Sequence, residues 1–129
     1  MTVATPTTEP LVAPPLPRRF PLAAFLLLLA EAPAHGYELV SRLHELGPVG
    51  VDLATHYRLL RAMEADSLVS STWGPSAAGP HRRTYFLAPA GVALLHTWAD
   101  LLRESHAAVD EYLDRYEVLI GEGRHSGAA

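Results

Sequence analysis

The residues of this chain that are best suited to chemistry are arginines near the middle of the sequence. Arg58 and Arg61 lie about one helical turn apart in a segment with helical periodicity. His81, Arg82 and Arg83 stand together between two runs that alternate like strands. Guanidinium groups bind phosphates and the edge of guanine, and small residues beside them let a helix approach a groove closely. These residue types and spacings indicate binding to nucleic acid.

Patterns for catalysis are missing from the sequence. Ser41, Ser70 and Ser71 have no base and orienting acid at the spacing of a catalytic motif. No glycine-rich phosphate loop follows a strand, and no pair of inward carboxylates is visible. We therefore predict a protein that is not an enzyme and that carries no cofactor.

The histidines raise the question of a metal site. The chain has seven histidines and no cysteine. His96 and Asp100, and likewise His106 and Asp110, have the i,i+4 spacing of two ligands on one helical turn. A complete site would need further ligands from a second copy of the chain. We predict no resident metal, and a metal-responsive sensor stays open as an alternative.

The charge of the chain is unevenly distributed. The formal net charge is −4, and all ten basic residues are arginine. Residues 18–88 hold seven arginines and six acids, whereas residues 100–129 hold seven acids and three arginines. Salt screens a phosphate charge within about 8–10 Å, so a local basic patch decides DNA affinity and the net charge does not exclude DNA. The absence of cysteine suits the reducing cytoplasm, where we expect the protein.

The chain begins with a segment rich in Thr and Pro, residues 1–20, which we predict to be a disordered arm. The apolar run that follows predicts a first helix over Leu22–Glu31, which Pro33 ends. Because arginines precede this run, a secretory signal stays open as an alternative. Pro21 at its start, and a length of only about nine apolar residues, favour a buried core helix over a membrane span.

Two further helices are predicted with a short turn between them. The second runs from Gly36 to Gly47, and its apolar positions are Tyr37, Val40, Leu43 and Leu46. Asp52 is a suitable N-cap for the third helix, Leu53–Asp66. On a helical wheel, the stripe facing the core consists of Leu53, Tyr57, Leu60 and Met63. The opposite face carries Thr55, Arg58, Arg61, Ala62 and Ala65.

A β-hairpin follows the third helix. Val69–Trp73 alternates as a strand, Gly74–Pro80 has the composition of a flexible loop, and Arg83–Leu87 is the partner strand. A basic hairpin of this kind lies along the minor groove or the phosphate backbone, where arginine binds well. Trp73 and Tyr85 are interpreted as packing residues of the hairpin.

The last helix is long and is predicted from Pro89 to about Ile120. Apolar residues recur along it at spacings of three and four, which is the pattern of a coiled-coil seam. No further domain remains for it to pack on, so we predict a homodimer; a helix folded back on its own domain is the alternative. Residues 121–129 are predicted to be a disordered tail. The predicted interface consists of Leu95, Trp98, Leu102, Val109, Tyr112, Tyr116 and Leu119.

The order of these elements predicts a mainly α fold. A winged helix-turn-helix domain with a two-stranded wing occupies residues 21–88, and a dimerisation helix occupies residues 89–120. The sequence resembles the PadR family of bacterial transcription regulators, over about Phe20 to Tyr116. The pieces that carry the resemblance are His35–Leu39 (HGYEL), Ala54–Leu60 (ATHYRLL) with Met63-Glu64, and the wing segments Ser70–Gly74 and Arg82–Leu87. The single helix after the wing is similar to that of the small subfamily.

The resemblance implies a homodimeric repressor that binds an inverted-repeat operator in double-stranded DNA. It also implies relief by a small aromatic or cationic effector near the dimer interface, where some members use a tryptophan. Leu102 stands at the position of that tryptophan, and Trp98 lies one turn away, so these two residues are the candidate effector contacts. The sequence departs from the family at His56, where Leu is usual, and at Ser67, where Gly is usual.

We therefore expect a DNA-binding regulator without a membrane segment. Thr55 and Arg58 are predicted to reach base edges in the major groove, and Arg61 to reach a phosphate. The hydroxyl of Tyr37 is predicted to bind a phosphate at the start of the second helix. The wing contacts are predicted to be His81, Arg82 and Arg83. A winged-helix adaptor that binds proteins and not DNA is the remaining alternative.

Overall fold

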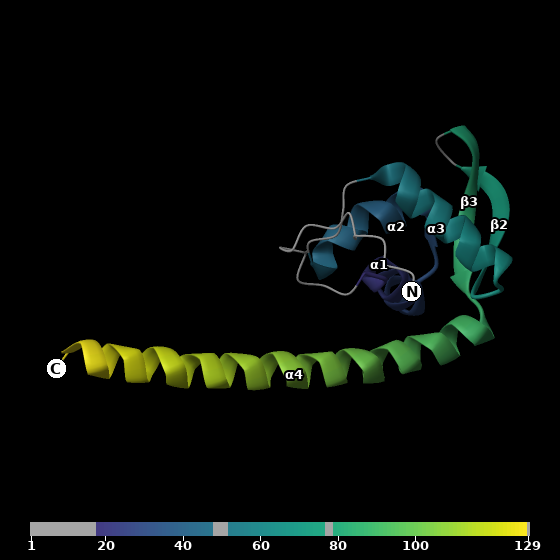
Figure 1. The fold of residues 1–129 in the computed structure, drawn as a ribbon. Helices are drawn as coiled ribbons and strands as arrows, with labels where there is room; N and C mark the ends of the chain where they lie inside the picture. Colours follow the sequence, from purple (N-terminus) through teal and green to yellow (C-terminus); the bar gives the residue numbers. More distant parts are fainter. Residues whose placement is uncertain (1–17, 48–51, 77–78, 129) are drawn as a thin grey trace, which may run out of the picture. The chain divides into compact units, whose positions relative to one another are not determined.

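The computed structural model describes residues 18–47, 52–76 and 79–128, with side chains described outside 75–81 and 123–128 (Figure 1). By their internal contacts, residues 1–92 and 93–129 form two units. The elements in chain order are α1 (Phe20–Glu31), β1 (Ala34–His35), α2 (Gly36–Arg42), the 3-10 helix η1 (Leu43–Leu46), α3 (Leu53–Ala65), β2 (Val69–Ser76), β3 (Gly79–Leu87) and α4 (Pro89–Ala128).

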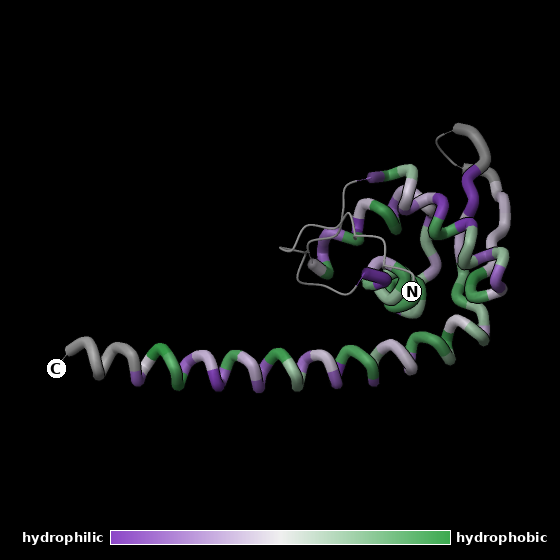
Figure 2. Tube along the Cα trace, viewed as in Figure 1, coloured by the Kyte–Doolittle hydropathy of each residue, from purple (hydrophilic) through white to green (hydrophobic). Residues whose placement is uncertain are grey.

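Helix α1 forms the centre of the first unit. It is apolar around most of its circumference, as Figure 2 shows, and a helix of this kind is stable only when neighbours cover it. Pro21 lies in its first turn, where a missing N–H costs nothing. The predicted core helix is confirmed, since its buried residues are Ala23, Ala24, Phe25, Leu26, Leu28 and Leu29. None of the helices in the described part of the chain is long and apolar enough to span a membrane.

The second helical segment buries part of the predicted apolar face, together with Leu39. Leu39, Val40 and Leu43 are buried. Tyr37, which the apolar pattern assigned to the core, is 75% exposed, so that assignment was wrong. Tyr37 lies in the first turn of α2, and Leu39 fills the core position on that side. After η1, Gly47 adopts a φ of 143°, a conformation that favours glycine, and the helical segment ends there.

Helix α3 begins and ends as predicted, to within one residue. Asp52 caps it by accepting a hydrogen bond from the backbone N–H of Thr55. Leu60 and Met63 are buried, and so is His56, whose ring meets that of Phe25 edge-on at 6.4 Å. Leu53 was wrongly predicted to face the core, because it is 58% exposed. A helical wheel gives direction but not depth, and Leu53 lies about 10 Å along the axis from Leu60.

The sheet is antiparallel, with strand order β1-β3-β2. The two-stranded wing is confirmed, with Ser71 opposite Tyr85 and Trp73 opposite Arg83. The sequence did not predict β1, which adds Ala34 opposite Tyr85 on the other side of β3. The flexible loop predicted over Gly74–Pro80 was largely wrong, since β2 runs to Ser76 and β3 starts at Gly79.

Helix α4 is the last element, and only its first residues belong to the first unit. It continues to Ala128, so the prediction of a disordered tail from residue 121 was wrong as far as Ala128. Hydrophobic residues recur along it in Figure 2, and several remain exposed: Val109, Tyr112, Tyr116 and Leu119. With three helices and a wing before this helix, the predicted fold class is confirmed.

Candidate nucleic-acid interface

The first two turns of α3 carry a chain of hydrogen bonds on an exposed surface. The Thr55 hydroxyl donates to Oδ2 of Asp52 at 2.6 Å, and Nη2 of Arg58 donates to the Thr55 oxygen at 3.1 Å. The hydrogen bonds from Thr55, first from its hydroxyl and then from its backbone, hold the pKa of Asp52 below its usual 3.8. The arrangement therefore orients Arg58 while leaving most of its donors available to a ligand.

Two arginines of the first unit point their charge to solvent without an acidic partner. Arg61 is exposed on α3, and Arg82 is exposed on β3. Among the described residues, neither makes an ion pair. Arg58, Arg61 and Arg82 thus give α3 and the wing a cationic surface, and their contact with DNA stays a prediction.

Arg83 differs from Arg82 because its charge is already engaged. Its Nη1 lies 3.5 Å from Oε1 of Glu64, and its guanidinium lies 5.0 Å from the centre of the Trp73 ring. Glu64 also accepts a hydrogen bond from the Ser71 hydroxyl at 2.6 Å. Glu64 on α3 is therefore bound to both strands of the wing, and these contacts fix the wing against α3.

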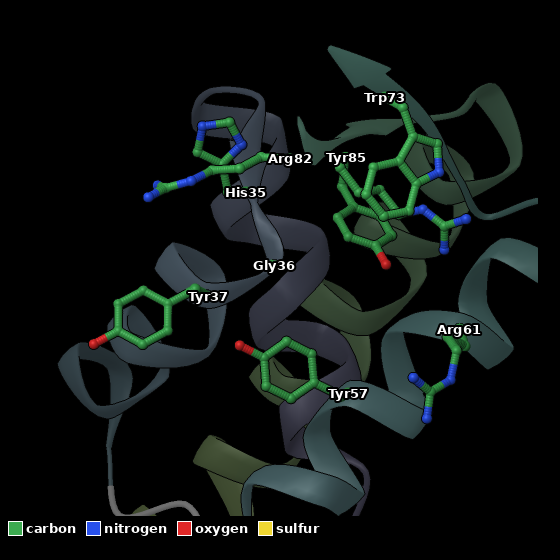
Figure 3. Close-up of a pocket in the computed structure, with 9 residues that line it drawn as sticks. His35, Gly36, Tyr37, Tyr57, Arg61, Trp73, Arg82 and Tyr85 are labelled. Carbon is green, nitrogen blue, oxygen red and sulfur yellow. The ribbon is translucent and has the colours of Figure 1, made fainter. Parts of the chain in front are cut away.

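An open hollow of about 640 Å³ lies between the start of α2, α3 and the wing (Figure 3). Gly36 forms part of its floor and packs closely against two aromatic rings. A Cβ at this position would lie 3.3 Å from the Tyr57 ring and 3.4 Å from the Tyr85 ring. Burial raises the pKa of the Tyr57 hydroxyl above its usual 10.0, with smaller effects from Tyr37 and Tyr85. The hydroxyl therefore stays protonated. The hollow is lined by His35, Gly36, Tyr37, Tyr57, Arg61, Trp73, Arg82, Arg83 and Tyr85.

The structure brings together only part of the predicted DNA-binding set. Tyr37, Arg61, Arg82 and Arg83 line the hollow, whereas Thr55 and Arg58 lie apart from it on the exposed start of α3. The side chain of His81 lies outside the described part of the structure. Sequence reasoning missed the role of Glu64. It also missed five uncharged residues that line the hollow, namely His35, Gly36, Tyr57, Trp73 and Tyr85. For Tyr57 and Trp73, the sequence signal was an aromatic residue close to the arginines that line the hollow.

The second unit holds the predicted interface and effector residues. Leu95, Trp98 and Leu102 are partly covered, and the residues farther along α4 are exposed. Tyr112, Tyr116 and Leu119 line a shallow groove there, together with Ala108, Glu111 and Arg115. The role of all these residues stays a prediction.

The predicted metal pairs occupy the same helix. Nδ1 of His106 lies 3.0 Å from Oδ2 of Asp110, but Asp100 is paired with Arg103 at 2.9 Å. Within the described ranges, no three side chains of the metal-binding types come together. A metal site on this helix would therefore require ligands from elsewhere.

Comparisons with known proteins agree on one family. Residues 25–97 match the family described as the Transcriptional regulator PadR-like family. None of the curated proteins compared with the chain matches it. Among solved structures, it is similar to a PadR-like transcription factor from Bacteroides fragilis, with 29% identity and a TM-score of 0.58, over 70% of this chain and 86% of that one. A PadR-like transcriptional regulator from Bacillus cereus gives 25% identity and a TM-score of 0.64, over 71% and 89%.

A third solved structure is that of Bacillus subtilis PadR in complex with operator DNA. Its identity to this chain is 24% and the TM-score is 0.56, over 64% of this chain and 48% of that one. The chain thus matches about half the length of that relative, and the similarity shows a shared fold.

Proposed function

Because the chain belongs to the PadR-like family of transcriptional regulators, we propose that it binds operator DNA as a homodimeric repressor. The operator is an inverted repeat, since a two-fold dimer presents two identical recognition helices. Its half-sites lie about 10 bp apart, centre to centre, or a multiple of that distance. The protein then acts in the cytoplasm, where the DNA is.

The observation that carries this proposal is the unpaired cationic surface of α3 and the wing. Arg58, Arg61 and Arg82 are exposed, on the two elements that enter or flank a groove in winged-helix proteins. In the proposed complex, Arg58 and Thr55 contact base edges. Arg61, Arg82, Arg83, His81 and the Tyr37 hydroxyl contact the phosphate backbone. A Bacillus subtilis relative with the same fold has been solved in complex with operator DNA, which supports the proposal that this chain binds DNA.

The proposed dimer rests on α4. Exposed tyrosines and leucines recur along this helix, and a contiguous apolar face on a surface is typical of an interface. A second copy that pairs along the seam covers them. We further propose, from the family resemblance alone, that a small aromatic or cationic effector near Trp98 and Leu102 relieves repression.

A salt-dependent titration tests the DNA-binding function. The full-length protein is titrated against duplex DNA from immediately upstream of its own gene, with unrelated duplex as competitor. Tight binding that resists the competitor and weakens steeply with salt is expected, because arginines release counterions from the phosphates. Equal weak binding to both duplexes, or no binding at low salt, would refute sequence-specific DNA recognition.

A further inference from the structure

The hollow beside α3 has the size of a small-molecule site. Ligand pockets in proteins commonly measure about 300–1,000 Å³ and combine apolar walls with a few polar groups. The hollow is about 640 Å³, and aromatic side chains supply most of its lining (Figure 3). A backbone phosphate needs only cations and hydrogen-bond donors. The aromatic floor therefore calls for a further explanation.

The charge of the lining selects for anions. Arg61, Arg82 and Arg83 line the hollow, and none of the described lining residues is acidic. The charge of Arg83 is offset by Glu64, which does not line the hollow and whose Oε1 lies 3.5 Å from Nη1 of Arg83. Two guanidinium groups are left, and guanidinium binds phosphate through paired hydrogen bonds. In the view of Figure 3, these two, Arg61 and Arg82, stand on opposite sides of the rings of Tyr57 and Tyr85.

The aromatic groups suit a flat ring. Trp73 remains 63% exposed although the Arg83 guanidinium lies over it, so much of the indole is free to stack. Stacking of a base on an aromatic side chain contributes about 1–3 kcal/mol and tolerates any base. Tyr57 keeps its hydroxyl protonated and can donate to an acceptor. A flat ring that carries a phosphate matches both halves of the lining.

We propose that this hollow is a binding site for a free mononucleotide, with its base on Trp73 and its phosphate at Arg61, which stands on the same side of the tyrosine rings as Trp73 in Figure 3. The charge of the hollow disfavours the cationic ligands expected near Trp98. The existence of the site does not rest on the proposed function. Its consequence for DNA binding does, since a nucleotide held by Arg61 competes with DNA for the same arginine.

Tryptophan fluorescence gives a direct test, because the chain has two tryptophans. In the full-length Trp98→Phe protein, Trp73 is the remaining reporter. AMP is expected to change its emission with a saturable curve. Adenosine lacks the phosphate, and ribose 5-phosphate lacks the base. Each should bind at least about tenfold more weakly than AMP, a loss of about 1.4 kcal/mol. Calorimetric titration of AMP into wild-type protein repeats the measurement without a substitution.

Two variants locate the site. Arg61→Ala is expected to weaken AMP binding by about tenfold. Arg103→Ala, which removes an exposed arginine from α4, should leave AMP affinity unchanged. If AMP binds no better than ribose 5-phosphate, or if Arg61→Ala does not change its affinity, the proposal is overturned. Binding of a 5′-phosphorylated single-stranded tetranucleotide in the absence of AMP binding would also overturn it and would assign the hollow to nucleic acid.

DNA binding is measured in parallel, without nucleotide, so that the two proposals fail separately. Operator binding that AMP does not displace, with no fluorescence change, would refute the nucleotide site and leave the repressor proposal standing. AMP binding by a protein that binds no duplex would support the site and refute the repressor. Displacement of the operator by AMP, and not by adenosine, supports both.

Discussion

Gly91→Ala is expected to destabilise the protein, although alanine favours helices. A Cβ at Gly91 would overlap the backbone carbonyl of Leu68 and lie 2.6 Å from Cδ1 of Leu87. The carbonyl cannot rotate away as a flexible side chain can, because it accepts a hydrogen bond from the N–H of Ala88 at 3.0 Å. Overpacking of this kind costs about 1–3 kcal/mol. Loss of the hydrogen bond between Ala88 and Leu68 destabilises the fold by about 1 kcal/mol more. The higher helix propensity of alanine stabilises it by a similar amount, about 1 kcal/mol.

The expected net loss in free energy of unfolding is therefore about 2 kcal/mol, measured by urea denaturation at fixed protein concentration. Gly121→Ala is the matched control, because the same change in the same helix meets no atom within 4 Å. That variant should gain up to about 1 kcal/mol from helix propensity. Equal stabilities for the two variants would show that Gly91 does not pack against Leu68 and Leu87.

Four further predictions follow from particular residues. Arg58→Ala should weaken operator binding by about 1–3 kcal/mol and relax one base position, and unchanged affinity would mean that the predicted helix phase is wrong. Leu102→Asp should give monomers in sedimentation equilibrium, whereas the adjacent exposed change Arg103→Asp should leave the dimer intact. Ser67, with a φ of 61°, is in the left-handed region, so Ser67→Gly should raise the free energy of unfolding by up to about 1 kcal/mol; a decrease would refute the strain. The pKa of Asp52 is lowered in the folded protein, so its carboxylate stabilises the fold above pH 3.8, and this stabilisation is lost as the pH falls through the folded pKa. Asp52→Asn should therefore lose less thermal stability on acidification than the wild type, and an identical pH dependence of the two proteins would contradict this prediction.

Much of the fold could be predicted because local rules fixed its elements. Pro21 and Asp52 mark the starts of α1 and α3, and both marks depend only on backbone donors near a helix end. Gly47 marks the end of the second helical segment by its positive φ. The period of the apolar residues then distinguished helices from the hairpin. None of these inferences needed a contact between residues far apart in the chain.

The failures share a different physical cause. Tyr37 is exposed although its neighbour Gly36 is buried, so it faces away from the core, and Leu53 stands before the part of α3 that neighbours cover. Strand β1 is two residues long, which is too short for any alternation to be visible. The pair of Glu64 and Arg83 joins residues from different elements. Depth along an element and pairing across elements are set by the assembled fold, and a wheel or a period contains neither.

The two neighbouring arginines of the wing show how the assembled fold differentiates residues that look equivalent in the sequence. Successive side chains of a strand point to opposite faces, so Arg82 and Arg83 have different neighbours although both border the hollow. The fold turns Arg83 toward Glu64 and Trp73, while Arg82 is exposed and, among the described residues, makes no ion pair. A phosphate can recruit Arg83 only by displacing Glu64, whereas Arg82 is available at no such cost. In the proposed complex, Arg82 therefore supplies the more readily available charge of the wing, and Arg83 first holds the wing at the angle to α3 from which Arg82 reaches the backbone.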